Sequence, residues 1–533
     1  MSLLFRTEDL AQDEISELFV ETASDRVIID QLKNRNPAIL VGSRGVGKSF
    51  LLKVAQSELL ADFDDDRVFP VYITFMRGSL LQTQDEAVFR AWMLAKIAKA
   101  IVKDLKRNGL FATVRNNAGS NDGDLLSNNI TEIDSFIKLA ENSWRAKGAI
   151  AVSVAIPDVD DFRDALEDLC YSLNIKRFVL LIDEAAHIFA PTQQREFFTL
   201  FRDLRASYIS CNAAVYPGVT SFGSAFQLAH DATVLEIDRD VQSDDYLKNM
   251  TDMVEKQADE KLQEAILRNR KNFSVLAYAS SGNPRLLLKT VFSAKKMSSS
   301  QVTDVIRNFY RTDMWRDHSD LAQKYIGHKE LVDWGRNFIE KSVLPAVKAK
   351  NDDYLETDRP TSAYFWISRD ATARVKSALR ILCYTGVIQE HETGIRASRS
   401  KIGTRYRLNL GVLFSEEGTF TMDKLLAIAN RLTPKRMTEY GSDHSTLVEL
   451  EQSSLIDSLM ESFSLSEQME KSSQELDLTL WQKSKLVELN LDTVGDVFEA
   501  SLDKFMEAYY VGNIRARQMR NAGEAAVLEY LSG

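Results

Sequence analysis

Short apolar runs alternate with longer amphipathic stretches through the first half of the chain. The runs span residues 38–41, 67–75, 177–184, 213–216 and 233–237, and each has the length of a buried strand. The stretches between them place apolar residues at helical spacing. Strands that alternate with helices favour a parallel sheet with helices packed on it, so the pattern predicts an α/β fold.

The amphipathic stretches of this half predict helices over residues 15–20, 24–34, 85–106, 133–147, 158–173 and 193–207, with a further helix starting at residue 50. Residues 116–129 are rich in Asn, Gly, Ser and Asp, a composition typical of a loop.

The second half of the chain follows a different pattern and predicts four further parts. Residues 245–351 are mostly helical in spacing and predict a helical lid. Residues 352–415 combine helices with two short strands, 386–390 and 404–408, around a basic loop, and this resembles a winged helix. A Ser/Glu-rich helical connector, 416–475, and a small helical unit, 476–533, complete the predicted division after an α/β domain at 1–244.

A glycine-rich loop follows the first predicted strand. Residues 42–49 read Gly-Ser-Arg-Gly-Val-Gly-Lys-Ser between that strand and a helical pattern, as a phosphate-binding loop requires. Glycines allow the backbone N–H groups to face phosphate, Lys48 reaches the β- and γ-phosphates, and the Ser49 hydroxyl can ligate Mg²⁺. The nucleotide contacts predicted here are Gly42, Ser43, Arg44, Gly45, Val46, Gly47, Lys48, Ser49 and Phe50.

Two acidic residues, Asp183 and Glu184, end the third predicted strand. Ligands of open α/β sheets bind at the carboxyl ends of the strands, so these acids are expected beside the phosphate loop. There Asp183 would hold Mg²⁺ and Glu184 would act as general base on the attacking water. The alternative is a pair of acids that caps the next helix.

Two polar positions extend this predicted site. Thr220 ends the next apolar run, where its hydroxyl could touch the γ-phosphate or the water; a plain turn is the alternative, and Ser221 competes for the role. Arg285 opens a helix after Ser281-Gly282-Asn283-Pro284 and could reach the γ-phosphate, with a solvated arginine as the alternative.

Together these motifs resemble an AAA+ ATPase, and within that class the Orc/Cdc6-like group, including prokaryotic relatives that overlap the signalling (STAND) ATPases. The resemblance covers roughly residues 15–415, and a winged helix after the lid fits the group. It implies a P-loop AAA+ parallel sheet with a helical lid, a winged-helix domain and a small all-α C-terminal domain. It also implies ATP and Mg²⁺ as cofactors, Thr220 as sensor 1 and Arg285 as sensor 2.

One departure from the group's pattern concerns the arginine finger. Such ATPases usually carry it between the sensor 1 strand and the next strand, but residues 221–237 contain neither Arg nor Lys. Arg202 and Arg205 are the candidates elsewhere. Because a finger can raise the rate of hydrolysis about 10³- to 10⁵-fold, its absence favours a slow switch over a fast motor.

Charge restricts where DNA could bind. The net charge of −11 excludes general attraction to polyanions, but residues 394–410 carry Arg and Lys without any acid, and Arg374, Lys376 and Arg380 precede them. A winged helix would place these residues on DNA phosphates. The alternative is a solvated hairpin used in protein contacts. The DNA contacts predicted here are Arg396, Arg399, Lys401, Arg405 and Arg407.

The last unit resembles a helix-hairpin-helix, as found in the C-terminal domain of the bacterial RNA polymerase α subunit. Its turn, 509–514, is followed by Arg515, Arg517 and Arg520. The usual second glycine is replaced by Asn513 or Ile514, which weakens the expected phosphate contact. We predict DNA contacts from Arg515 and Arg517, with a protein-docking domain as the alternative.

The composition argues against disulfides, a structural zinc site and a membrane-spanning segment. The three cysteines are far apart and no Cys/His cluster exists, so we expect neither disulfides nor structural zinc. No signal peptide and no run of about 18 apolar residues is present, so we expect a cytoplasmic chain that does not cross a membrane.

Three functions fit these features. The first is an ATP-dependent DNA-binding switch, which could assemble as a homo-oligomer on ATP or DNA. The second is a signalling or anti-phage defence ATPase that recruits a separate effector protein. The third is a nucleotide-binding scaffold with negligible turnover.

Overall fold

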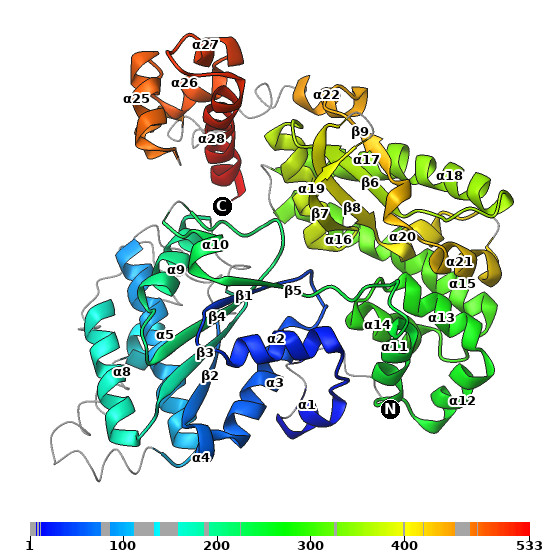
Figure 1. Cartoon of the computed structure of the whole chain (residues 1–533), viewed down its shortest axis with the longest axis horizontal. Helices are drawn as coiled ribbons and strands as arrows, with labels where there is room; N and C mark the ends of the chain where they lie inside the picture. The colour runs from blue at the N-terminus through cyan, green and yellow to red at the C-terminus, as the bar shows by residue number, and fades with distance from the viewer. Residues whose placement is uncertain are drawn as a thin grey trace. The chain divides into compact units, whose positions relative to one another are not determined.

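The computed structural model divides into two compact units (Figure 1). The first comprises Met1–Gln263 with Gly282–Lys289, and the second Glu264–Ser281 with Thr290–Gly533. The structure describes Thr7, Leu10 and residues 12–75, 86–110, 133–138, 158–185, 191–223, 225–324, 328–397, 400–418, 420–452, 469–476 and 478–532.

A five-stranded sheet forms the centre of the first unit. Its order is β2-β3-β4-β1-β5, and every pair of neighbours is parallel, so all carboxyl ends lie along one edge. This confirms the predicted α/β fold. The strands are β1 Ala38–Val41, β2 Val68–Thr74, β3 Arg177–Asp183, β4 Ile209–Val215 and β5 Thr233–Glu236.

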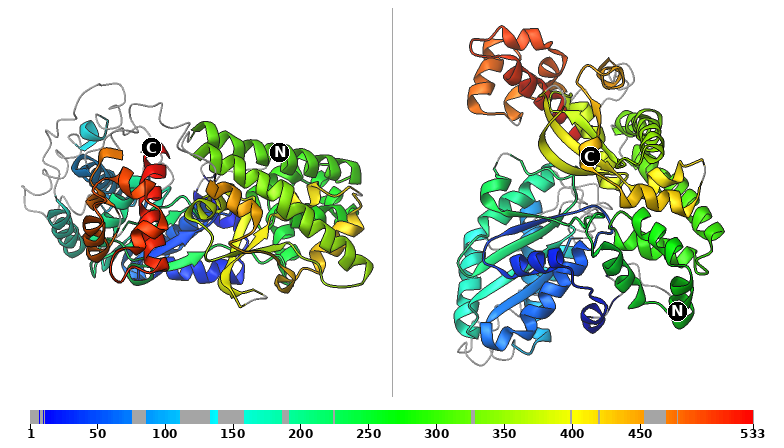
Figure 2. Two further views of the ribbon diagram at one scale, coloured as in Figure 1. Left: turned by 90° about the horizontal axis from the view of Figure 1, so that it is seen from above. Right: turned by 45° about the vertical axis from the view of Figure 1, so that its right-hand side comes forward.

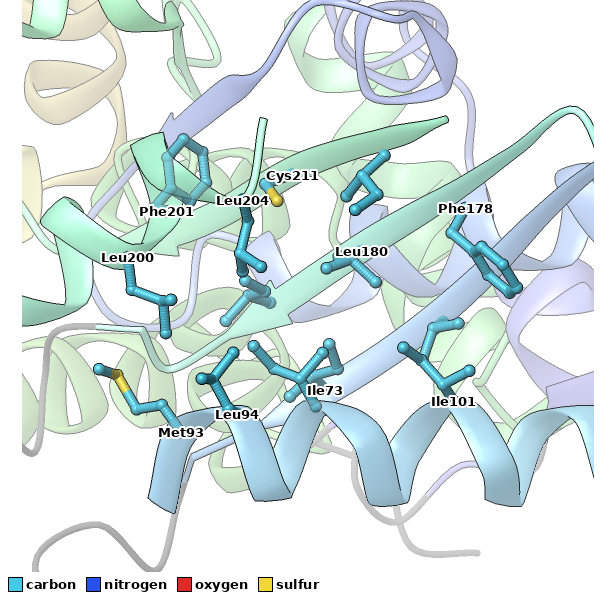
Figure 3. Close-up of a cluster of buried hydrophobic side chains, with 14 of the residues drawn as sticks. Ile73, Met93, Leu94, Ile101, Phe178, Leu180, Leu200, Phe201, Leu204 and Cys211 are labelled. Atoms are coloured by element: carbon cyan, nitrogen blue, oxygen red, sulfur yellow. The ribbon is translucent and has the colours of Figure 1, made fainter. Parts of the chain in front are cut away.

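Helices cover both faces of this sheet (Figures 1 and 2). One face packs on α1 Gln12–Leu18, α2 Ala23–Lys33 and α3 Lys48–Ala61, the other on α5 Glu86–Arg107, α8 Val159–Leu173 and α9 Pro191–Asp203. Figure 3 shows Leu94 and Ile101 of α5 directed at Ile73 and Leu180 of the strands. The remaining helices that lie within this unit are α4 Phe63–Asp66, α10 Leu228–Asp231 and α11 Tyr246–Glu255.

Strand β4 begins at Ile209, four residues before the apolar run that predicts it. The hydrophobic pattern misses its start because two buried residues there are polar. Ser210 and Asn212 break the apolar pattern before residue 213. The Asn212 side chain is fully buried and makes two bonds, accepting from the Ala38 N–H (3.1 Å) and donating to the Leu32 carbonyl (2.9 Å). Its polar atoms are satisfied inside the core, so the strand tolerates it.

Some predicted segments lie outside the described residues. These are the loop at 116–129 and residues 139–147 of the helix predicted over 133–147, of which 133–138 is helical. Among the described residues, no helix is long and apolar enough to span a bilayer. All three cysteines are buried free thiols.

The second unit begins with a series of helices, in the region where the sequence predicts a helical lid. Two helices cross the boundary between the units: α12 Glu260–Arg268, and α14 Pro284–Ser293, whose first residues belong to the first unit. The others are α13 Arg270–Ala279, α15 Ser299–Asn308, α16 Met314–Lys324, α17 Lys329–Phe338 and α18 Leu344–Glu356.

A winged helix follows the bundle, as expected. Helix α19 Ala373–Thr385 is followed by the hairpin of β7 Ile388–Arg396 and β8 Ile402–Leu408, and β8 pairs antiparallel with β6 Tyr364–Ser368. The sheet gains a fourth strand, β9 Thr438–Tyr440, which pairs parallel with β6. Part of the predicted helical connector therefore belongs to this sheet.

A small helical unit ends the chain and has its own apolar core, which includes Leu486, Val497, Phe505 and Met519. Residues 453–468, which precede it, lie outside the described part of the chain. Its helices are α25 Leu480–Glu488, α26 Val494–Glu499, α27 Leu502–Met506 and α28 Asn513–Ser532. Three helices lie between the wing and this small unit: α20 Leu410–Ser415, α21 Met422–Asn430 and α22 Ser445–Gln452.

One histidine of the second unit is buried with both ring nitrogens in hydrogen-bond contact. His318 of α16 is fully buried, with Nε2 3.1 Å from the Val332 carbonyl and Nδ1 3.1 Å from the Thr385 hydroxyl. Because a carbonyl only accepts, Nε2 carries the proton of a neutral ring. Burial lowers the pKa of His318 to about 4, with a further lowering by Arg336 and an opposing effect of the Val332 bond.

We expect the free energy of unfolding to fall as pH drops from about 6.5 to about 4. In that window the unfolded chain binds a proton at His318 and the folded chain does not, so stability rises with pH, by about 3 kcal/mol across the window. Chemical denaturation at several pH values measures this. His318→Gln should flatten the profile and the surface control His230→Gln should not; equal profiles for the wild type and His318→Gln would contradict the assignment.

Candidate nucleotide-binding site

The phosphate loop connects β1 to α3 as the sequence predicts. The strand ends at Val41 and the helix begins at Lys48. Two glycines inside the loop have left-handed backbones, Gly45 at φ +88° and Gly47 at φ +106°. A Cβ atom on Gly45 would also lie 2.8 Å from the Arg285 Cβ, so the loop needs glycine there for both conformation and space.

Lys48 is buried at the start of α3. Its Nζ donates to the Gly42 carbonyl (2.6 Å) and the Ser43 carbonyl (3.1 Å) and lies 3.7 Å from the centre of the Tyr216 ring. Burial lowers the pKa of Lys48 to about 7, whereas Asp183 and Glu184 raise it. The ammonium is thus poorly solvated, and a phosphate beside it would offset that cost.

The two predicted acids lie at the end of β3, each bonded to a tyrosine. Asp183 is buried and accepts from the Tyr72 hydroxyl (2.6 Å). Glu184 has a left-handed backbone, φ +55°, and accepts from the Tyr216 hydroxyl (3.0 Å). Burial, and then the charge of Asp183, raises the pKa of Glu184. Neither tyrosine was predicted as part of the site, because each lies in an apolar run and has the pattern of a core residue.

The turn that contains Arg285 lies on the phosphate loop. Asn283 Nδ2 donates to the Arg44 carbonyl (2.9 Å), and the Arg285 N–H donates to the Gly45 carbonyl (3.4 Å). Arg285 and Arg44 also act electrostatically on Lys48. The structure therefore brings Lys48, the two acids and Arg285 together.

Thr220 does not end a strand, contrary to our expectation. Strand β4 ends at Val215, and Thr220 lies in the turn that follows, where its hydroxyl donates to the Tyr216 carbonyl (2.8 Å). A plain turn after Pro217-Gly218 was the alternative given for this position. Ser221 donates its N–H to Gln194 Oε1 (2.6 Å). Tyr216, directly after the strand, is the residue that contacts Glu184.

The residues at the site fit ATP with Mg²⁺. Ser49 lies in the first turn of α3 and is half-buried, and Asp183 ends the buried strand β3. A hydroxyl and a carboxylate are oxygen ligands of the kind that Mg²⁺ takes together with phosphates. Gly45 and Gly47 leave the backbone of the loop open to a phosphate.

Arg239 holds the phosphate loop through a hydrogen bond to its backbone, a role that was not predicted from the sequence. Its guanidinium donates to the Val46 carbonyl (2.7 Å) and pairs with Asp25 in the first turn of α2 (3.0 Å). The side chains of Arg239 and Asp25 are 9% and 2% exposed, so this is a buried ion pair. Arg239 lies two residues after the segment 221–237, and no spacing rule predicts its contact with the loop.

A family model described as ORC-CDC6-like matches residues 2–268. The chain belongs to the ORC-CDC6-like family. Its structure is similar to that of the Walker-type ATPase PABY2304 of Pyrococcus abyssi, with 13% identity, a TM-score of 0.36 and coverage of 79% of this chain and 97% of that one. No curated protein matches.

Two archaeal structures from Aeropyrum pernix are also similar to this chain. The ORC1 protein in complex with DNA has 13% identity and a TM-score of 0.31, covering 76% of this chain and 92% of that one. The ORC2 protein in its ADPNP–ADP complexes has 11% identity and a TM-score of 0.31, covering 78% and 92%. Membership of the ORC-CDC6-like family agrees with the nucleotide-binding site predicted from the sequence.

The basic residues of the wing of this ORC-CDC6-like chain differ in exposure. Arg396 and Lys401 are exposed. Arg405 is 11% exposed and pairs with Glu392 (2.5 Å), and Arg407 is buried, donating to Gln389 Oε1 (2.6 Å). From this position Arg407 cannot offer its guanidinium to a phosphate, contrary to the prediction that it contacts DNA. Arg399 lies outside the described residues.

Around α19 the cations form a local cluster. Arg369 and Arg380 are exposed and Lys376 is half-buried, whereas Arg374 is buried. Burial lowers the pKa of Lys376, and the positive charges of Arg380, Arg517 and Arg369 lower it further against the opposing charge of Asp370. Arg369, which precedes α19, was not among the cations predicted from the sequence.

The two arginines predicted from the last unit are both exposed at the start of α28. Arg515 lies 4.7 Å from the Trp481 ring and donates to the Tyr510 carbonyl (2.7 Å). Arg517 lies 3.6 Å from Asp370.

We expect Arg239→Met to weaken both stability and nucleotide binding. Removal of Arg239 leaves the buried Asp25 carboxylate without a cation, although the Thr22 hydroxyl still donates to it (2.7 Å), and loss of one partner of a buried pair costs about 3–5 kcal/mol. The Val46 carbonyl also loses its donor, so the phosphate loop is held less firmly. Unfolding free energy and the Kd of an ATP analogue measure the two effects.

The matched control is Arg268→Met, which removes an exposed pair with Glu264 and should change stability by less than about 1 kcal/mol. A similar loss in both variants would argue against a special role of the buried pair.

Proposed function

We propose that this chain is an ATP-hydrolysing switch whose nucleotide state controls DNA binding by the winged helix. One observation carries the proposal: the turn before α14 is bonded to the phosphate loop, beside Lys48, Asp183 and Glu184. Helix α14 begins in the first unit and ends in the second. Helix α14 therefore connects the nucleotide site, along the chain, to the part of the sequence that carries the exposed cations.

The side chains at the site have complementary roles in hydrolysis. Lys48 and the loop N–H groups hold the β- and γ-phosphates, and Arg285 binds the γ-phosphate from the lid. Glu184 orients a water, accepts its proton as the oxygen attacks the γ-phosphorus, and ADP leaves with the bridging oxygen. Mg²⁺, held by Ser49 and Asp183, would neutralise charge on the phosphates.

Slow turnover suits a switch. The segment 221–237 offers no cation to act as a finger, Arg202 already pairs with Asp203 (2.9 Å), and Arg205 is exposed on the surface of the first unit. A bound ATP would then persist long enough to define a state.

The DNA contacts that we propose come from exposed cations. Arg396 and Lys401 flank the tip of the wing, Arg369 precedes α19 and Arg380 lies within it. Phosphate contacts position a protein on a duplex and make its affinity depend on salt. Arg515 and Arg517 remain further candidates in the last unit.

We expect Arg396→Ala/Lys401→Ala to weaken DNA binding and reduce the slope of log K against log[salt] by about 2, since each lost phosphate contact removes about 0.9. Glu184→Gln with ATP should bind DNA more tightly than the same protein with ADP. Binding to a labelled duplex between about 50 and 200 mM salt measures both.

The control Lys261→Ala/Arg268→Ala removes two exposed charges from α12 and should bind like the wild type. Equal slopes for the two double variants would exclude the wing as the contact. Equal affinity with ATP and ADP would exclude the switch and leave a constitutive DNA binder.

A second candidate function, recruitment of a separate effector protein by a signalling ATPase, is favoured by the last unit. Among the described residues, ten large hydrophobic side chains are exposed, and six of them lie in this short segment. Residues 469–533 also carry eleven acidic and seven basic residues, a balance that favours protein over DNA. The six are Leu480, Trp481, Val487, Tyr509, Tyr510 and Ile514.

We expect Leu480→Asp/Ile514→Asp to abolish recovery of a partner that co-purifies with the tagged wild-type chain from its native host. The control Tyr171→Asp/Leu267→Asp places the same charges on other exposed apolar residues and should retain the partner. Quantitative mass spectrometry of the two preparations measures this, and equal recovery would remove the last unit as the docking site.

A further inference from the structure

Tyr216 contacts both halves of the nucleotide site. Its ring centre lies 3.7 Å from Lys48 Nζ, and its hydroxyl lies 3.0 Å from Glu184 Oε1. The side chain is 6% exposed, so both contacts are shielded from water. We infer that Tyr216 is a positioning residue for ATP hydrolysis, which holds the carboxylate of Glu184 through its hydroxyl and supports the ammonium of Lys48 with its ring.

The order of the strands explains why one residue reaches both groups. Strand β4 lies between β3, which ends at the acids, and β1, which ends at the phosphate loop. The backbone just before Tyr216 is bonded to both sides: the Val215 carbonyl accepts from the Gly42 N–H (3.4 Å) and the Ala214 carbonyl from the Ala185 N–H (3.3 Å). The backbone at Tyr216 is therefore held between the phosphate loop and the two acids.

The turn after β4 holds Tyr216 from its other side. Thr220 Oγ1 donates to the Tyr216 carbonyl (2.8 Å), which closes the turn through Pro217 and Gly218. Thr220 acts here on the backbone of Tyr216, and its hydroxyl is engaged. The polar group that faces Glu184 from β4 is thus the hydroxyl of Tyr216.

The hydroxyl and the ring have separable effects. Burial and the neighbouring Glu184 raise the pKa of Tyr216, so the hydroxyl stays protonated and donates to the carboxylate. A bond to a charged group fixes the direction of Glu184, which matters for a base that must point at a water. The ring contributes a cation–π contact to Lys48 that needs no hydroxyl.

Two variants separate these effects. Tyr216→Phe keeps the ring and should lower kcat about 10- to 100-fold while KM and the Kd of a non-hydrolysable ATP analogue change by less than about 2-fold. Tyr216→Leu also removes the ring and should weaken analogue binding about 3- to 10-fold. A residue with only a structural role would not separate kcat from Kd in this way.

A double-mutant cycle links the hydroxyl to its partner. In a Glu184→Gln background, whose own kcat is low, Tyr216→Phe should cause no further loss, because the two groups act as a unit. The matched control is Tyr278→Phe, which removes a hydroxyl bonded to Asn430 (2.9 Å) in the second unit and should leave kcat unchanged. Thermal denaturation confirms that each variant is folded.

The inference rests on the proposed role of Glu184 in hydrolysis, and the outcomes distinguish the two. Absence of turnover in the wild-type chain would overturn both. Wild-type turnover that Glu184→Gln abolishes but Tyr216→Phe leaves intact would overturn the role of Tyr216 alone. Additive losses in the cycle would show that the tyrosine acts on another group and would likewise overturn it.

Discussion

The burial of one ammonium group governs the arrangement of the first unit. Lys48 begins α3 inside the protein, where a charge is costly unless other groups surround it. Two loop carbonyls and an aromatic ring lie in contact with it, and two carboxylates act on it electrostatically. These groups come from β1, β3 and β4, so the site exists only when the three strands are parallel and aligned at their carboxyl ends.

The sequence predicts those parts of the site in which a residue type and its neighbours together form a recognisable motif. A glycine-rich loop before Lys-Ser, and two acids after an apolar strand, have few structural alternatives at that spacing. Arg285 was found because it follows a helix-starting Asn-Pro. Tyr72 and Tyr216 escaped because a tyrosine serves equally as core and as hydrogen-bond donor. Only the order β2-β3-β4-β1 places their hydroxyls beside the acids, and no local pattern discloses that order.

The wing shows a different limit of sequence reasoning. Arg405 and Arg407 are two residues apart on β8, so they lie on the same face of the sheet. Their guanidinium groups donate to Glu392 and Gln389 of the neighbouring strand β7. A count of charges treats these arginines like Arg396 and Lys401, which are exposed. Pairing across the hairpin decides which cations remain available, and that depends on a register with irregularities near Glu392.

Asn212 shows how closely folding and chemistry are connected in this chain. Its buried amide fits one alignment of β4, because its two bonds go to the Ala38 N–H and the Leu32 carbonyl. A shift of one residue would turn the amide to the opposite face and leave polar groups unsatisfied in the core. The same shift would carry Tyr216 away from Lys48 and Glu184. A chain with shifted strands is therefore less stable even without nucleotide. A chain with the correct register of β4 already has Tyr216 beside Lys48 and Glu184.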